Sequence, residues 1–152
     1  MVVGAKDGQI EFHIPFDDVP TSASLNPAGF NNIDGELVES EIVRLDTFFK
    51  DKDVPDFMKI DVEGFEHEVL QGCEGLFKAG HRPGFILECN PGGPDKLITD
   101  ILKPLGYEFL HLMPKGPQTK PEVKALEGDS FRNWAAIHPD QAPGRSKEKK
   151  AA

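Results

Sequence analysis

Residues 57–64 read FMKIDVEG, and this stretch decides the fold class of the chain. The apolar residues within 57–62 predict a buried strand that ends at Glu63 and Gly64. A helix is expected directly afterwards, because apolar residues at 65, 69, 70, 73, 76 and 77 recur at helical spacing and Gly80 suits the helix end. The stretch therefore predicts a strand that leads at once into a helix, which is the first half of an α/β unit.

The same order of elements continues toward the C-terminus. Residues 85–87 form a short apolar run bounded by Pro and Gly, which suits a buried strand of a parallel sheet. Apolar residues at 97, 98, 101, 102 and 105 predict the next helix, and residues 107–112 and 133–137 predict two further strands. Strand, helix, strand, helix, strand is typical of an α/β fold with a mainly parallel sheet.

Two more strands are expected before this unit. Apolar and polar residues alternate over 10–14, which predicts a half-buried strand that Pro15 ends. Residues 17–41 are rich in Pro, Ser, Asn, Gly and Asp and predict a long loop, and residues 42–44 predict the second strand. Asp46 is the expected N-cap of a short helix that follows.

Length, composition and charge set limits on function. A chain of 152 residues with 38% hydrophobic and 28% charged residues is the size of one globular domain, which we expect over residues 1–138, followed by a disordered polar tail over 139–152. The formal net charge of −9 argues against a general binder of nucleic acid or of anionic membranes. No apolar run is long enough to span a bilayer, no secretory signal opens the chain, and two cysteines make no disulfide framework, so we expect a cytoplasmic protein.

Acidic residues follow the two central strands at the ends where α/β sheets bind ligands. Asp61 and Glu63 share one strand face, because residues i and i+2 point the same way. Glu88 ends the next strand, which a right-handed crossover commonly places beside the first. Asn90 follows two residues later and adds an amide. We therefore expect three carboxylates to converge in one small volume.

Three interpretations of these acids stay open from the residues alone. They could bind a divalent cation, as in a carboxylate-based metal hydrolase. One of them could act as a general base for a hydroxyl. They could also only cap the following helix. Lys59 shares the strand face of Asp61, so either an ion pair with Asp61 or a lysine that extends along the surface to solvent is expected. His67, on the first turn of the helix, is a weak candidate for a substrate contact, and His111 has no obvious partner.

Several segments together resemble one known family. These are IVRLDTFF at 42–49, FMKIDVEGFE at 57–66, VLQG at 69–72 and the Leu-Glu pair at 87–88. In this combination they are similar to the FkbM family of methyltransferases, and the likeness covers residues 1–137.

The resemblance implies a class I, Rossmann-like methyltransferase fold that uses S-adenosylmethionine. It implies transfer of a methyl group to a hydroxyl of a small metabolite or sugar, with Asp61, Glu63 and Glu88 as the catalytic carboxylates. Asn90 and His67 are the weaker substrate-binding candidates, and no metal ion is implied. Which carboxylate is the base stays undecided.

The resemblance also implies that the chain is the C-terminal half of such an enzyme. Family members carry a Gly-rich cofactor loop and a ribose-binding acid upstream of the segments matched here. The strand that ends at Asp61 then has an open edge, so we expect self-association. A non-catalytic remnant or interaction module is the alternative from a different functional class.

Overall fold

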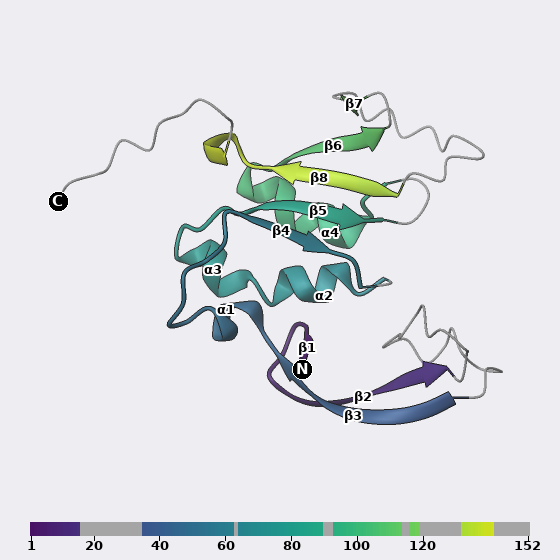
Figure 1. Cartoon of the computed structure of the whole chain (residues 1–152). Helices are drawn as coiled ribbons and strands as arrows, with labels where there is room; N and C mark the ends of the chain where they lie inside the picture. Colours follow the sequence, from purple (N-terminus) through teal and green to yellow (C-terminus); the bar gives the residue numbers. More distant parts are fainter. Residues whose placement is uncertain (16–34, 63, 90–92, 114–115, 119–131, 142–152) are drawn as a thin grey trace.

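The computed structural model describes residues 1–15, 35–62, 64–89, 93–113, 116–118 and 132–141, and these form two β-sheets with helices packed beside them (Figure 1). The first sheet has the strand order β1-β3-β2 and the second has the order β4-β5-β8-β6-β7. The strands are β1 Val2–Val3, β2 Gly8–Pro15, β3 Gly35–Val43, β4 Phe57–Ile60, β5 Gly84–Glu88, β6 Glu108–Met113, β7 Gly116–Gln118 and β8 Asn133–Ile137. The helices are α1 Leu45–Phe48, α2 Glu66–Gln71, α3 Glu74–Lys78 and α4 Lys96–Leu102, with 3₁₀ turns η2 Lys103–Leu105 and η3 Pro139–Gln141. No helix in these ranges has the length and hydrophobicity needed to cross a bilayer.

The first sheet contains the strand predicted before Pro15 and a longer partner than expected. β2 pairs antiparallel with β3 along its whole length, from Gly8 opposite Ile42 to Pro15 opposite Gly35. The prediction of a loop over 17–41 is therefore wrong for residues 35–41, and residues 17–34 lie outside the described residues. Residues 36–41 lack apolar alternation, and they form a strand because β2 supplies hydrogen-bonding partners for their backbone.

The second sheet is mixed, so the expectation of a mainly parallel sheet is wrong. β4 and β5 are parallel, but β8 pairs antiparallel with both β5 and β6, and β7 pairs antiparallel with β6. The order strand, helix, strand does give β5 and β6 the same direction. They are not neighbours, because the last strand, β8, inserts between them. Local periodicity carries no signal for such a long-range insertion.

The helix expected after β4 is divided into α2 and α3 at Gly72 and Cys73. The backbone N–H of Asp46 donates to the Gly72 carbonyl at 2.9 Å. A Cβ atom at Gly72 would lie 2.3 Å from the Gly4 carbonyl oxygen. The N-terminal segment therefore packs directly against the helix break, and a side chain at Gly72 would push it away.

The hydrophobic core lies between the second sheet and helices α2, α3 and α4. Phe85 and Leu87 of β5 are fully buried, as are Leu70 of α2 and Leu102 of α4. Tyr107 joins this core and donates its hydroxyl to the Pro83 carbonyl at 2.8 Å. The register of the strands places the same face of each strand toward the helices and leaves the other face uncovered by them.

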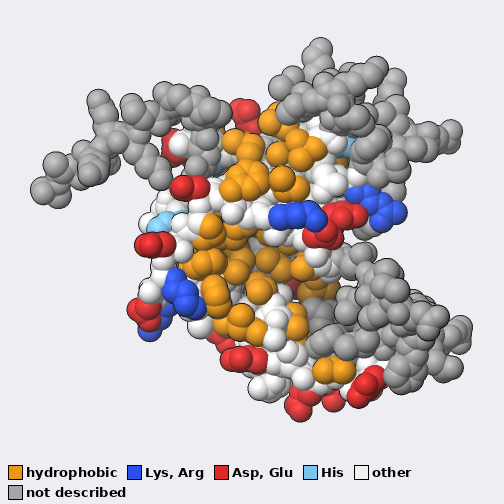
Figure 2. Space-filling model, in the orientation of Figure 1, with side chains coloured by type: hydrophobic (Ala, Val, Ile, Leu, Met, Phe, Trp, Pro, Cys, Tyr) orange, Lys and Arg blue, Asp and Glu red, His pale blue; other side chains and the backbone are white. Residues whose placement is uncertain are grey.

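The face of the second sheet that points away from the helices is apolar and partly exposed. Figure 2 shows hydrophobic side chains gathered over the strands on this side of the molecule. Phe57 is 47% exposed at the start of β4, and Ile86, Leu110 and Ile137 are half-buried on the same face. β4 also stands at the edge of the sheet, with β5 as its described neighbour on one side.

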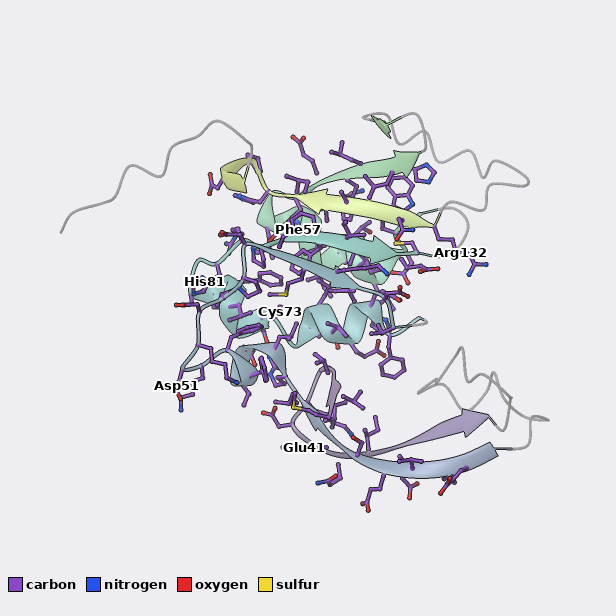
Figure 3. The ribbon with its side chains drawn as sticks, viewed as in Figure 1. Glu41, Asp51, Phe57, Cys73, His81 and Arg132 are labelled. Atoms are coloured by element: carbon purple, nitrogen blue, oxygen red, sulfur yellow. The ribbon has the colours of Figure 1, made fainter. Side chains whose placement is uncertain are left out.

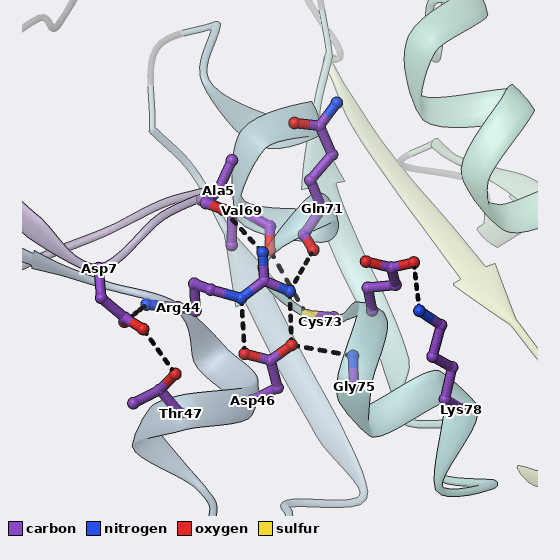
Figure 4. A network of polar contacts seen from close by, with 11 residues as sticks. Ala5, Asp7, Arg44, Asp46, Thr47, Val69, Gln71, Cys73, Gly75 and Lys78 are labelled. Atoms are coloured by element: carbon purple, nitrogen blue, oxygen red, sulfur yellow. Dashed lines mark hydrogen bonds and ion pairs between the residues drawn. The ribbon is translucent and has the colours of Figure 1, made fainter.

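A polar network around Arg44 joins the first sheet to the helices (Figure 4). Its guanidinium donates to both carboxylate oxygens of Asp46, at 2.8 and 2.6 Å, and to the Ala5 carbonyl at 2.7 Å. Asp46 Oδ2 also accepts the Gly75 backbone N–H of α3 at 2.9 Å. Asp46 lies in the first turn of α1 rather than at its N-cap, which is Arg44, so the predicted cap is wrong. Its side chain serves the contact with α3 instead.

We predict that Asp46→Ala lowers the free energy of unfolding at neutral pH by about 1–3 kcal/mol, because it leaves the Arg44 guanidinium and the Gly75 N–H without their acceptor. The hydrogen bond from Arg44 lowers the pKa of Asp46. The carboxylate therefore stabilises the fold at neutral pH, and this contribution is lost as the pH falls through the folded-state pKa. Urea unfolding of both proteins at decreasing pH should show the difference shrink in acid. Asp51→Ala, at an exposed loop position, should leave stability unchanged.

We also predict that the chain self-associates through β4, because an edge strand with an apolar face offers unpaired backbone groups to a second copy. Light scattering after size-exclusion chromatography should show a mass that rises with protein concentration. Phe57→Lys should favour the monomer, since a charge at an edge opposes pairing. Leu97→Lys is the matched control, because Leu97 is also exposed, at 51%, but lies on α4. A monomer at every concentration contradicts the prediction.

Candidate functional site

The parallel pairing of β4 with β5 brings two of the predicted acids to one edge of the sheet. Ile60, the last residue of β4, pairs with Leu87 of β5. Asp61 directly follows Ile60, and Glu88 directly follows Leu87. The expectation that these strands are neighbours is confirmed, and their acids lie side by side at the carboxyl ends of the strands.

Asp61 contacts both a lysine and the second acid. Lys59 forms an ion pair with Asp61, which is one of the two interpretations left open by the sequence, and the two side chains are 57% and 35% exposed. The hydrogen bond from Lys59 is the largest cause that lowers the pKa of Asp61, while burial opposes it. A side-chain hydrogen bond with Glu88 lowers the pKa of Asp61 further. Lys59, Asp61 and Glu88 are called the Lys59 triad below.

A buried glutamate holds the turn that follows Asp61. Glu66 is 6% exposed, and its Oε1 accepts the backbone N–H groups of Val62 and Gly64, each at 3.3 Å. Gly64 has φ +97°, a conformation that glycine adopts without strain. This role of Glu66 was not predicted from the sequence, although an acid two residues after the glycine, in the first turn of a helix, was a usable signal.

β8 completes the edge on the far side of Glu88. Asn133, the first residue of β8, pairs with Glu88, and the Cys89 N–H donates to the Arg132 carbonyl at 2.8 Å. Figure 3 shows Arg132 at the end of the sheet toward which β5 runs. The Asn133 side chain therefore shares the outer face of the sheet with Glu88.

The other predicted site residues have different positions. Glu63 and Asn90 lie outside the described residues. His67 of α2 has its Nδ1 2.9 Å from Oε2 of its neighbour Glu68, and the side chain of each is 23% exposed. His111 does have a partner, because its ring stacks on Trp134 with centroids 4.5 Å apart and planes 10° apart.

Cys89 lies beside the acids but is not suited to metal binding. Burial raises the pKa of its thiol to about 12, and the charges of Glu66, Asp95 and Glu88 raise it further, so the thiol stays protonated at neutral pH. Within the described part of the chain, no three His, Cys, Asp or Glu side chains form a group that could hold a metal ion. The described residues thus give no support to the interpretation as a metal hydrolase.

The model of the methyltransferase FkbM domain matches residues 1–109. This chain belongs to the FkbM methyltransferase family. The match covers the N-terminal sheet, the Arg44 network, the Lys59 triad and the start of β6. No curated protein and no solved structure gave a match. The family membership identifies the protein as a methyltransferase in general terms, and the Lys59 triad lies in the part of the chain that the family model covers.

We predict that Glu66→Ala destabilises the turn between β4 and α2. The variant leaves the N–H groups of Val62 and Gly64 without an acceptor, which should cost about 1–3 kcal/mol in the free energy of unfolding. Amide hydrogen exchange should become faster at residues 61–65 than elsewhere in the sheet. Glu74→Ala is the control, because Glu74 is exposed and pairs with Lys78 on the surface. Equal exchange at 61–65 in both variants contradicts this role for Glu66.

Proposed function

We propose that the protein is an S-adenosylmethionine-dependent O-methyltransferase of the FkbM type, which methylates a hydroxyl group of a small metabolite or sugar. Family membership supports methyl transfer. The observation that carries the choice of a hydroxyl acceptor is the pair of acids Asp61 and Glu88, which lie side by side at the carboxyl ends of neighbouring parallel strands. Ligands of open α/β sheets bind at this end.

A hydroxyl needs this kind of partner because it is a poor nucleophile while it keeps its proton. A carboxylate within hydrogen-bond reach orients the acceptor oxygen and takes its proton as the oxygen attacks, which contributes about 10²–10⁴-fold to rate. The side chain of Asp61 is 35% exposed and Glu88 is half-buried, so an acceptor can reach them from solvent. The net charge of −9 favours a small, uncharged or cationic acceptor over a nucleic acid.

The described residues fit the reacting end of the methyl donor. The donor supplies an electrophilic methyl group on a positively charged sulfur, and the carboxylates of Asp61 and Glu88 attract positive charge. The residues that would grip its nucleoside are not identified among the described ranges. The protein's own contribution at this edge is therefore to bind the acceptor hydroxyl, hold it in line and remove its proton.

Calorimetry and product analysis test this proposal. We expect heat of binding when S-adenosylmethionine is titrated into the full chain, and a methyl ether when isotope-labelled donor is incubated with sugars and other small hydroxyl compounds. Asp61→Asn and Glu88→Gln should lower kcat by about 10²–10⁴-fold, because each removes a carboxylate that handles the proton.

Asp100→Asn is the matched control, because Asp100 is an exposed acid on α4 that pairs with Lys96. It should leave both donor binding and turnover unchanged. If no heat is measured at millimolar donor, the protein does not act as a methyltransferase by itself, and a non-catalytic interaction module becomes the better description.

A further inference from the structure

We propose that a second copy of this chain pairs antiparallel with β4 over residues 58–62, in the register that sets Ile60 opposite Ile60 of the other copy. Among the strands that the structure describes, β4 is the outermost of the second sheet, and only β5 lies beside it (Figure 1). An open edge explains why two copies associate. The side chains of residues 58–62 determine how the copies align and what each contributes to the other.

The open edge of β4 offers backbone groups at alternate residues. The Gly84 N–H of β5 donates to the Asp56 carbonyl at 2.9 Å, so the backbone groups of Asp56 face β5. Because these groups alternate between the two sides of a strand, those of Phe57, Lys59 and Asp61 face the open edge. The Phe57 ring lies toward β5 and away from this edge, since two of its carbon atoms are 2.6 Å from the position that a Cβ atom on Gly84 would take. A second strand can therefore reach the backbone of β4.

Both faces of β4 match the same register. On the face away from the helices, Lys59 and Asp61 carry opposite charges and form an ion pair. On the face toward the helices, Met58 is half-buried and Val62 is 36% exposed. With Ile60 at the two-fold axis, Lys59 of each copy lies opposite Asp61 of the other, and the same register sets Met58 opposite Val62. Opposed charges stabilise a strand pair, and burial of the two apolar side chains adds to this.

The neighbouring registers lack this match. A two-fold axis perpendicular to the sheet passes through one residue of each strand and keeps each face on its own side. With Lys59 at the axis two lysines are opposed, and with Asp61 at the axis two carboxylates are, which destabilises the pair. With Met58 at the axis, Lys59 lies opposite Phe57 and has no opposed charge. The charges of β4 therefore select the register with Ile60 at the axis.

Pairing in this register brings a lysine of one copy to the acids of the other. A lysine on an edge strand commonly opposes association, because two copies bring like charges together. Lys59 acts differently here, since its charge meets the Asp61 carboxylate of the second copy. Asp61 lies beside Glu88 at the carboxyl ends of β4 and β5. Each acid edge therefore gains Lys59 of the second copy, and the two acid edges adjoin at the axis of the dimer.

Exchange of the two charges tests the pairing by analytical ultracentrifugation, with circular dichroism to check the fold. Lys59→Asp opposes two carboxylates and Asp61→Lys opposes two lysines, so either variant should raise the dissociation constant of the dimer about tenfold. An equimolar mixture of the two variants should associate again, because an acidic strand then faces a basic one. The double variant Lys59→Asp/Asp61→Lys should also recover. Lys96→Asp, which changes a surface charge on α4, should associate as the native chain does.

Disulfide formation tests the register. Under mild oxidation, Lys59→Cys mixed with Asp61→Cys should form a disulfide between copies, because opposed residues with paired backbone groups have Cα atoms about 5.5 Å apart. Lys59→Cys alone should form none, since its two cysteines are then too far apart along the strands, beyond the ~7 Å that a disulfide spans. The native chain, whose Cys73 and Cys89 are buried, is the control.

Three results would overturn the proposal. They are a native chain that is monomeric at every concentration, charge variants that associate as strongly as the native chain, and Lys59→Cys that forms a disulfide by itself. None of these measurements depends on methyl transfer, so the pairing of two copies and the proposed function succeed or fail separately.

Discussion

The parallel pairing of β4 with β5 is the constraint on which the site depends. Ile60 and Leu87 are buried on the face toward the helices, at 4% and 0% exposure, and they pair with each other. A slip of one residue in either strand would turn these side chains toward solvent and the neighbouring acid toward the core. The hydrophobic core therefore holds Asp61 and Glu88 side by side on the outer face of the sheet.

The turn after β4 is fixed from two directions. The Glu66 carboxylate bonds to the backbone of Val62 and Gly64, which anchors the turn to the start of α2. The end of α2 is in turn held by the N-terminal segment, since Gly72 lies against Gly4 and its carbonyl accepts from Asp46. Contacts far from the acids thus determine where α2 lies, and α2 determines the path of the chain just beyond Asp61.

The sequence predicted the parts of the fold that depend on local pattern. The structure contains the strand and helix that start at Phe57, the buried strand that ends at Glu88 and the last strand at 133–137. It also places Asp61 beside Glu88, as predicted. The wrong predictions concern partners that are distant in sequence. β8 inserts between β5 and β6, and residues 35–41 become a strand because β2 pairs with them. Asp46 was predicted as a helix cap because its contact with the Gly75 N–H of α3, which is 29 residues away, cannot be seen in the local sequence.

Lys59 shows that an ion pair predicted from the sequence can have a neighbour that the sequence pattern does not indicate. The pattern Lys59, Ile60, Asp61 predicts a pair on one strand face, and a pair this exposed contributes about 0–1 kcal/mol to stability. The position of this ion pair matters because Glu88 lies beside Asp61, and only the parallel pairing of β4 with β5 shows that it does. Lys59 therefore pairs with an acid that has a second acid beside it, an arrangement that the local pattern of residues 59–61 could not indicate.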